Sequence, residues 1–284
     1  MLLHFIRIII IAILISLLIF LPYLPGDYDA SSVTLSSMAQ LLGFSSLLFV
    51  PIGIGWLLYE TIKQKKKNAT VSNNSYRFAI AALAVSIFVV LVTSLGAFAN
   101  HSLSLAGITI LIYIFIFPKI VTRVKQIKNK TNKCFNPTPV YLVCIPIIVV
   151  LIRSLFIVPA IEFSRNYAIK QSEQYIQDIE SYYKRNGHYP VSLLSLWNDY
   201  RPTVRGIKQY HYERNGNGYN VYFEQFSNEL GVQEIVMYNK FDEHEMTSHD
   251  ADLLQLSLAE QDRQRGYISV HQLPQKNWKY FWFD

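Results

Sequence analysis

The sequence predicts a membrane-embedded bundle of five helices followed by an α+β domain, in which a long helix packs on an antiparallel sheet. Hydrophobic residues make up 51% of the chain and charged residues 16%, whereas an ordinary soluble domain has about 25% charged residues. All long apolar segments precede Ser164. The net charge changes there from +9 over residues 1–164 (13 basic, 4 acidic) to −3 over residues 165–284 (13 basic, 16 acidic). We therefore expect a transmembrane bundle over residues 1–163 and a second domain over residues 164–284.

Five segments are long and apolar enough, or nearly so, to span a bilayer, which takes about 20 mostly apolar residues. They cover residues 3–24, 35–59, 78–98, 103–117 and 140–161. We expect Pro118 to end the fourth helix, because proline removes a backbone donor. Gly53 and Gly55, beside Pro51, are expected to be packing residues of the second helix, with a break at a functional site as the alternative.

The basic residues predict the orientation of the bundle. Two loops, after the second and the fourth segment, contain 11 of them: Lys63, Lys65, Lys66, Lys67, Arg77, Lys119, Arg123, Lys125, Lys128, Lys130 and Lys133. The loop over residues 26–34 contains none. Cytoplasmic loops are enriched in Lys and Arg, so we expect a cytoplasmic N-terminus and an extracytoplasmic second domain. No aromatic residues alternate with these basic runs, which argues against nucleic-acid binding. We expect the bundle to lie in the lipid bilayer with these charges retained beside its helices, and specific binding of anionic lipids by the basic runs is the alternative.

Arg153 is the candidate site within the bundle, because ionisable residues in spanning segments are costly and commonly functional. It could extend to the outer headgroups, pair with Glu162 or face a cavity. A membrane enzyme or small-solute permease would use a site near Arg153. A transporter or a proton relay usually has several ionisable residues in its spanning segments, whereas the predicted bundle has one.

The second domain has one long helix and several strands. Ala168, Tyr175 and Ile179 recur at helical spacing, and Asn186-Gly187 provides a helix end. A short helix is expected over 191–197, a hairpin over 209–214 and 219–226, strands over 232–239 and 276–283, and an amphipathic helix near 253–263. One helix followed by strands is typical of an α+β domain.

The segment at the end of this helix resembles type IV pilins and type II secretion pseudopilins. In that family, a membrane-anchored helix ends in a Tyr-x-x-x-Asn-Gly-x-Tyr-Pro segment and packs on an antiparallel sheet. Tyr182 or Tyr183, Asn186, Gly187, Tyr189 and Pro190 occupy those positions here. The resemblance covers residues 150–192 and implies a pilin-like fold. It implies no pilus assembly, because four apolar segments precede the helix.

Candidate chemistry in the second domain is limited to an acidic stretch with two histidines. Carboxylates and imidazoles bind divalent cations, so the weak metal candidates are Asp242, Glu243, His244, His249 and Asp250. A solvated acidic loop is the alternative. No nucleophile motif, phosphate loop or dinucleotide fingerprint is present, so we expect no cofactor. Cys134 and Cys144 both lie before the second domain and provide it with no disulfide.

We expect a binding or structural function, in which the bundle presents the second domain to an envelope protein or a surface polymer. The 13 tyrosines after Ser164 could contribute to a ligand-binding face, although packing in the core would account for most of them.

Overall fold

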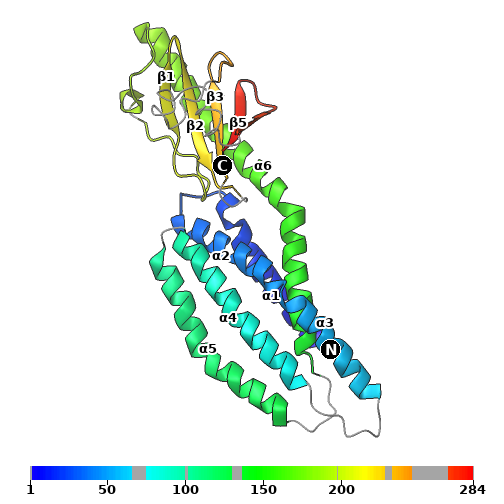
Figure 1. Ribbon diagram of the computed structural model, residues 1–284. Coiled ribbons are helices and arrows are strands. Elements are labelled where there is room, and N and C mark those ends of the chain that lie inside the picture. The colour runs from blue at the N-terminus through cyan, green and yellow to red at the C-terminus, as the bar shows by residue number, and fades with distance from the viewer. Residues whose placement is uncertain are drawn as a thin grey trace, which may run out of the picture. The chain divides into compact units, whose positions relative to one another are not determined.

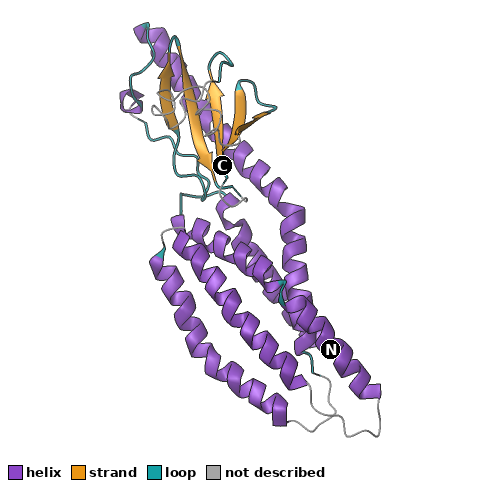
Figure 2. Cartoon of the chain, in the orientation of Figure 1, coloured by secondary structure: helices purple, strands orange, loops and turns teal. Residues whose placement is uncertain are grey.

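The computed structural model describes residues 2–65, 75–99, 102–129, 136–196, 198–227, 232–244 and 268–283. The chain divides into two compact units. The first, here called the bundle, comprises Met1–Leu21 and Ser31–Ile157, and the second, here called the α+β domain, comprises Pro22–Ala30 and Val158–Asp284. The strands all belong to the second unit (Figure 2).

The helices of the described residues are α1 (Leu2–Phe20), α2 (Ala30–Ser46), α3 (Phe49–Lys65), α4 (Ser75–Ala99), α5 (Leu103–Asn129) and α6 (Thr138–Asn186) (Figure 1). By length and composition, α1, α4, α5 and α6 could each cross a membrane. The pair α2 and α3 meets the same test only when taken together, and it is bent by 42° at the break. Several long apolar helices therefore precede a small antiparallel sheet.

The prediction of one helix over residues 35–59 was wrong. The chain forms two helices, and the break falls between Ser46 and Phe49 rather than at the glycines. Pro51 lies in the first turn of α3, where backbone N–H groups have no intrahelical partner, so its missing donor costs little. The helix then continues through Gly53 and Gly55.

The predicted end of the fourth helix at Pro118 was also wrong, because α5 continues to Asn129 with Pro118 in its interior. A proline removes one backbone hydrogen bond but does not oblige the helix to stop. One turn later, the Thr122 hydroxyl donates to the Pro118 carbonyl at 2.8 Å.

Small residues allow close helix packing within the bundle. A Cβ atom on Gly53 would lie 2.6 Å from Val143 Cγ2 and 3.1 Å from the Pro139 carbonyl oxygen, so α3 lies very close to α6. Trp56 is buried nearby in a cluster with Ala79 and Val124. Gly53 thus has a packing role, as expected.

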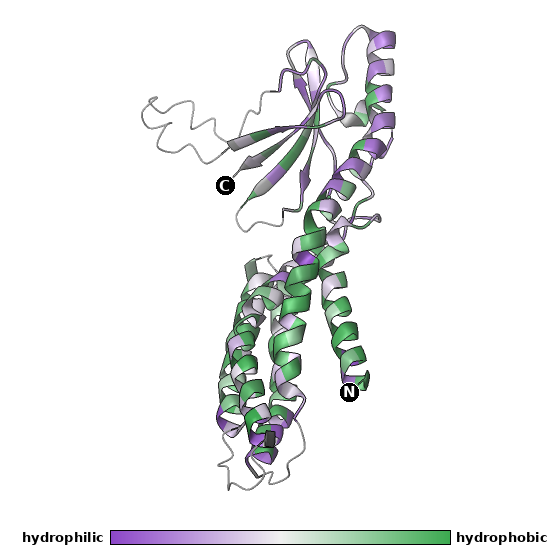
Figure 3. Ribbon diagram, turned by 90° about the vertical axis from the view of Figure 1, so that its right-hand side faces the viewer, coloured by the Kyte–Doolittle hydropathy of each residue, from purple (hydrophilic) through white to green (hydrophobic). Residues whose placement is uncertain are grey.

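Helix α6 changes character along its 49 residues. Its first part is apolar, and its second part has one polar and one apolar side (Figure 3). Ala168, Tyr175 and Ile179 are all fully buried, which confirms the helical periodicity. The predicted helix end is confirmed as well, since α6 ends at Asn186 and Gly187 has φ +74°.

The sheet has the strand order β1-β2-β3-β5-β4, with every neighbouring pair antiparallel. The strands are β1 (His211–Asn215), β2 (Gly218–Gln225), β3 (Gln233–Asn239), β4 (Ile268–Gln272) and β5 (Trp278–Phe283). The hairpin and the two later strands were predicted, but β4 was not. The predicted short helix is a 3-10 turn, η2 (Leu193–Leu196), and the helix expected near 253–263 lies outside the described residues.

Helix α6 packs along one face of the sheet (Figures 1 and 3). The core between them joins Ala168, Tyr175 and Ile179 of the helix to sheet residues such as Phe223 and Trp278. Fully burying side chains of this size contributes about 1.5–3 kcal/mol each. The part of α6 from Val158 onwards therefore belongs to the same compact unit as the sheet.

Residues 22–30 belong to the α+β domain although 127 residues separate them from Val158. Gly26 N donates to the Thr203 carbonyl at 2.9 Å, and Arg205 N donates to the Leu24 carbonyl at 3.1 Å. Tyr23 is buried with its ring centroid 5.8 Å from that of Phe226. This loop is thus a structural part of the domain.

Candidate functional site

Arg153, the candidate site of the bundle, lies on α6 and bonds to α2. Its Nε and Nη2 donate to Gln40 Oε1 at 3.1 and 3.0 Å, and its guanidinium carbon lies 4.7 Å from the centre of the Phe44 ring. An acceptor oxygen and an aromatic face both stabilise a guanidinium that has left water.

The hydrogen bonds continue from Gln40 to α1. Gln40 Nε2 donates to Ser36 Oγ at 3.3 Å, and Ser36 Oγ donates to the Ile19 carbonyl at 2.6 Å. Ser36 is fully buried. Arg153 thus belongs to a row of hydrogen bonds that joins α6, α2 and α1, a structural role that requires no ligand.

Glu60 is a buried carboxylate that the sequence analysis did not single out. Its Oε1 accepts hydrogen bonds from Trp56 Nε1 at 3.2 Å and from Ser75 Oγ at 2.6 Å. Trp56 and Glu60 are four residues apart, so they lie on the same side of α3. A tryptophan four positions before a glutamate in an apolar helix is the sequence pattern that indicates this pair. Its hydrogen bonds connect α3 to the start of α4.

Three of the five metal candidates lie in the described part of the chain, and His249 and Asp250 lie outside it. His244 Nδ1 is 3.4 Å from Asp242 Oδ1, and Lys279 Nζ is 3.2 Å from the same oxygen. Burial lowers the pKa of His244 below its usual value. Within the described residues, no group of three or more His, Cys, Asp or Glu side chains is placed to hold a metal ion.

A buried ion pair attaches α6 to the sheet. Arg165 Nε and Nη2 donate to Glu234 Oε1 at 3.0 and 2.6 Å, and Trp282 Nε1 donates to Glu234 Oε2 at 2.8 Å. The Arg165 guanidinium also lies 3.9 Å from the centre of the Tyr280 ring. Both charges are almost fully buried, and such a pair needs these additional partners to offset its desolvation. No local sequence pattern indicates this pair, because its members are 69 positions apart.

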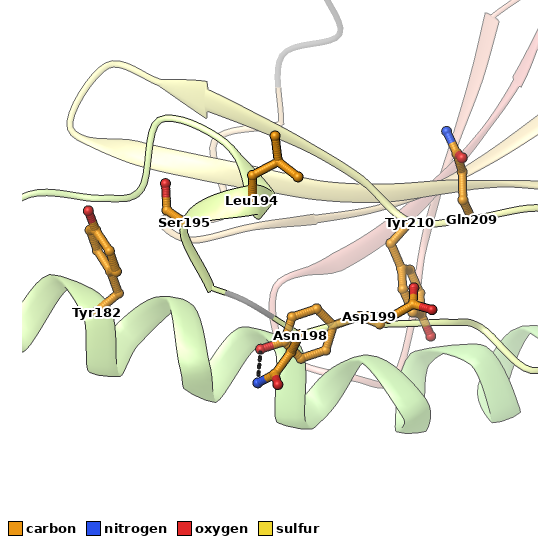
Figure 4. Close-up of a pocket in the computed structure, with 8 residues that line it drawn as sticks. Tyr182, Leu194, Ser195, Asn198, Asp199, Gln209 and Tyr210 are labelled. Atoms are coloured by element: carbon orange, nitrogen blue, oxygen red, sulfur yellow. Dashed lines mark hydrogen bonds between the residues drawn. The ribbon is translucent and has the colours of Figure 1, made fainter.

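One cleft of the α+β domain, here called the tyrosine cleft, has a volume of about 1090 Å³. Three segments line it, namely α6, the stretch from η2 to Tyr200, and the residues just before β1 (Figure 4). Tyr182, Tyr200 and Tyr210 contribute aromatic surface, and Leu194 is 84% exposed at this site. Ser195, Asn198, Asp199 and Gln209 contribute polar groups.

A hydrogen-bond network beside the cleft holds Tyr200 in place. The Tyr200 hydroxyl donates to Asp178 Oδ2, and Asn198 Nδ2 lies within hydrogen-bond distance of that hydroxyl (3.2 Å; Figure 4) and of Asp178 Oδ2 (3.3 Å). The Tyr200 ring stacks on Tyr175 with centroids 4.5 Å apart. Burial and the bond to Asp178 raise the pKa of Tyr200 to about 12, so its hydroxyl remains a donor at neutral pH.

A smaller polar cleft of about 270 Å³ shares Asp199, Tyr200 and Gln209 with the tyrosine cleft. Asp27 and Tyr28, from the loop that joins α1 to α2, also line it. Asp199 forms an exposed ion pair with Arg201 at 2.6 Å. The two clefts thus adjoin through shared residues.

Nine of the described tyrosines after Ser164 lie in the core or pack against it, as expected, and two of these nine, Tyr200 and Tyr210, also line the cleft together with Tyr182. The sequence suggested an aromatic face without identifying its members, because three separate segments contribute them. No protein-family model, curated protein or solved structure matches this chain.

Proposed function

We propose that the chain is a multi-pass membrane protein that presents the α+β domain outside the cytoplasm, where its tyrosine cleft binds an envelope protein or a surface polymer. The observation that carries the proposal is the open cleft of about 1090 Å³, with three tyrosines and several polar side chains in its lining. Concave sites with aromatic walls and a few polar groups are the usual places for ligands.

Membrane insertion is supported by the surface of the bundle. The apolar window of α5 is only 6% buried, and the corresponding windows of α1, α4 and α6 are 17–28% buried. Large side chains such as Leu111 and Phe115 are exposed on α5. A soluble protein rarely exposes so much contiguous apolar surface, whereas a lipid bilayer covers it.

Charge and connectivity support the orientation. The 11 basic residues fall within residues 63–77 and 119–133, at the ends of α3, α4 and α5 and in the segments that follow α3 and α5, which fits a cytoplasmic location. Residues 22–30 and the segment after Ile157 fold into the same unit, as expected if both lie on the other side of the bilayer. An active C-terminal fusion to a reporter that works only outside the cytoplasm is the expected result, and an inactive fusion reverses the orientation.

A pilin-like architecture of the α+β domain is part of this proposal. Its support is a helix that begins in an apolar segment, ends at Asn186-Gly187 and packs on an antiparallel sheet. Tyr189 is buried against Tyr219, with ring centroids 4.9 Å apart. The proposal concerns the fold of the domain and not assembly into a pilus.

A bundle site near Arg153 is the less supported alternative, because Gln40 and Phe44 already provide its guanidinium with partners. An Arg153→Leu variant that inserts, folds and leaves the cellular phenotype unchanged is the result we expect. Loss of the phenotype with normal folding would favour the alternative.

Site-specific photocrosslinking in intact cells tests the binding function. A photoreactive residue at Leu194 lies in the cleft, and one at Val270, which is 57% exposed on β4, serves as the control. Leu194 is expected to form discrete or polymeric adducts that the control does not form. Equal labelling at both positions, or none at either, would contradict the proposal.

A further inference from the structure

We infer that the ligand of the tyrosine cleft is a neutral, hydroxyl-rich saccharide chain. This inference rests on the proposed function and names the chemistry of the surface polymer. Three properties of the described cleft lead to it, namely its charge, the groups in its lining and its extent.

The charge of the cleft disfavours an anionic ligand. Among the described lining residues none is Lys or Arg, and Asp199 is the only carboxylate. Arg201, which lies outside this lining, forms an exposed ion pair with Asp199 at 2.6 Å. The nearby Asp178 carboxylate accepts hydrogen bonds from Tyr200, Asn198 and Gln174. An acidic polymer would therefore meet Asp199 and no Lys or Arg in this lining. The adjoining polar cleft adds Asp27, Arg201 and Lys208, so the two clefts together have no excess of positive charge, whereas a neutral chain has no charge to desolvate.

The groups in the lining suit sugar rings. The face of an aromatic ring is electronegative, so it attracts the weakly positive C–H groups on one side of a pyranose. Tyr182 and Tyr200 are both partly exposed, and the stack on Tyr175 holds the Tyr200 ring in position. Rings restrained in this way lose little conformational entropy when a ligand binds.

The polar lining has both donors and acceptors. Asn198 and Gln209 each carry an amide with two donor hydrogens and an acceptor oxygen, and Ser195 has a hydroxyl that both donates and accepts. Sugar hydroxyls also donate and accept, so they can pair with every one of these groups. A peptide backbone would instead present only one donor and one acceptor per residue.

The extent of the cleft indicates an oligomer. Pockets for small ligands are usually about 300–1,000 Å³ and enclose most of the ligand, whereas this cleft lies at the upper end of that range and is open. It adjoins the polar cleft of about 270 Å³ through Asp199, Tyr200 and Gln209. A chain of several sugar units could pass from Tyr182 to Tyr28 of the loop after α1.

Titration of the full-length protein in lipid nanodiscs tests this inference. The probes are three neutral hexasaccharides (maltohexaose, cellohexaose and chitohexaose in its fully acetylated form), an anionic galacturonate hexamer and a proline-rich peptide. Tyr182→Leu removes a ring from the cleft, and Tyr183→Leu is the matched control at the next position of α6. Thermal unfolding of each variant verifies its folding, and Asn198→Ala provides a second change within the cleft.

We expect at least one neutral hexasaccharide to bind, and its affinity to fall about tenfold in Tyr182→Leu and in Asn198→Ala but less than twofold in Tyr183→Leu. No binding of any neutral hexasaccharide, preferential binding of the anionic hexamer or of the peptide, or equal loss in all three variants would overturn the inference. If the titration gives one of these results but photocrosslinking still produces adducts at Leu194 that the Val270 control does not form, the inference about saccharides fails and the proposed binding function stands. Absence of both saccharide binding and adducts would overturn both.

Discussion

Pro25 and Val204 form an antiparallel bridge between segments that lie far apart in the sequence. The bridge joins the loop that leaves α1 to the chain between η2 and β1. A Cβ atom on Gly206 would lie 2.8 Å from both the Cβ and the carbonyl oxygen of Pro22, so the two segments are in close contact. The α+β domain is therefore incomplete without residues 22–30.

Tyr23→Ala is expected to destabilise the domain by about 3–5 kcal/mol, the usual cost of deleting a buried aromatic ring. Tyr23 is 2% exposed against Phe226. Urea unfolding of the full chain in detergent, followed by tryptophan fluorescence, measures the change. Tyr28→Ala is the control, because Tyr28 is 44% exposed in the same loop and should cost less than about 0.5 kcal/mol. Equal effects of the two substitutions would contradict a structural role for the loop.

Removing one member of the Arg165–Glu234 pair is expected to cost about 3–5 kcal/mol, because the other charge stays buried without its counter-charge. Glu234→Gln and Arg165→Met are the single variants. The double variant should lose much less than the sum of the two, since neither charge is then left alone. A double-mutant cycle based on urea unfolding measures this coupling. Additive losses would show that the two residues do not stabilise the domain as a pair.

Gly53→Ala is expected to lower the thermal stability of the bundle, because its Cβ would overlap Val143 and approach Pro139. Such overpacking typically costs about 1–3 kcal/mol. Gly107→Ala is the matched control, because a Cβ there meets no atom within 4 Å and alanine favours the helix. Thermal unfolding in one detergent compares the two. A larger loss for the Gly107 variant would contradict the close approach of α3 to α6.

The α+β domain is expected to lose stability as the pH rises above about 10. The pKa of Tyr200 is raised to about 12 in the folded state, against about 10 in the unfolded chain. The neutral phenol is therefore favoured by folding, and this stabilisation is complete below pH 10 and is lost as the pH rises towards 12. Tyr200→Phe should weaken the pH dependence, as measured by urea unfolding between pH 8 and pH 12. An identical slope in the variant would show that Tyr200 does not contribute to it.

Local features of α6 and of the hairpin were predictable from the sequence. The buried side of α6 has helical spacing, and Gly187 adopts the positive φ that ends the helix. In the hairpin, Asn215 pairs with Gly218 across a turn in which Gly216 has φ +52°. Neighbouring residues determine these features, so a single stretch of sequence contains the necessary information.

The bends and continuations of the bundle helices were not predictable in the same way. The apolar pattern predicted one helix over residues 35–59, and proline predicted a helix end at Pro118, whereas the chain breaks between Ser46 and Phe49 and continues through Pro118. Packing against neighbouring helices can offset the cost of such residues. Strand β4 was missed for a related reason, because a five-residue edge strand depends on its pairing with β5.

The sequence by itself determined that long apolar helices precede an acidic α+β domain, and where α6 and the hairpin end, because these properties depend on composition and on residues a few positions apart. Only the tertiary structure decided that Arg165 pairs with Glu234, that residues 22–30 complete the domain, and that three tyrosines from separate segments share one cleft. Contacts between distant segments arise when many weak interactions form together, and no local pattern records which partners will meet.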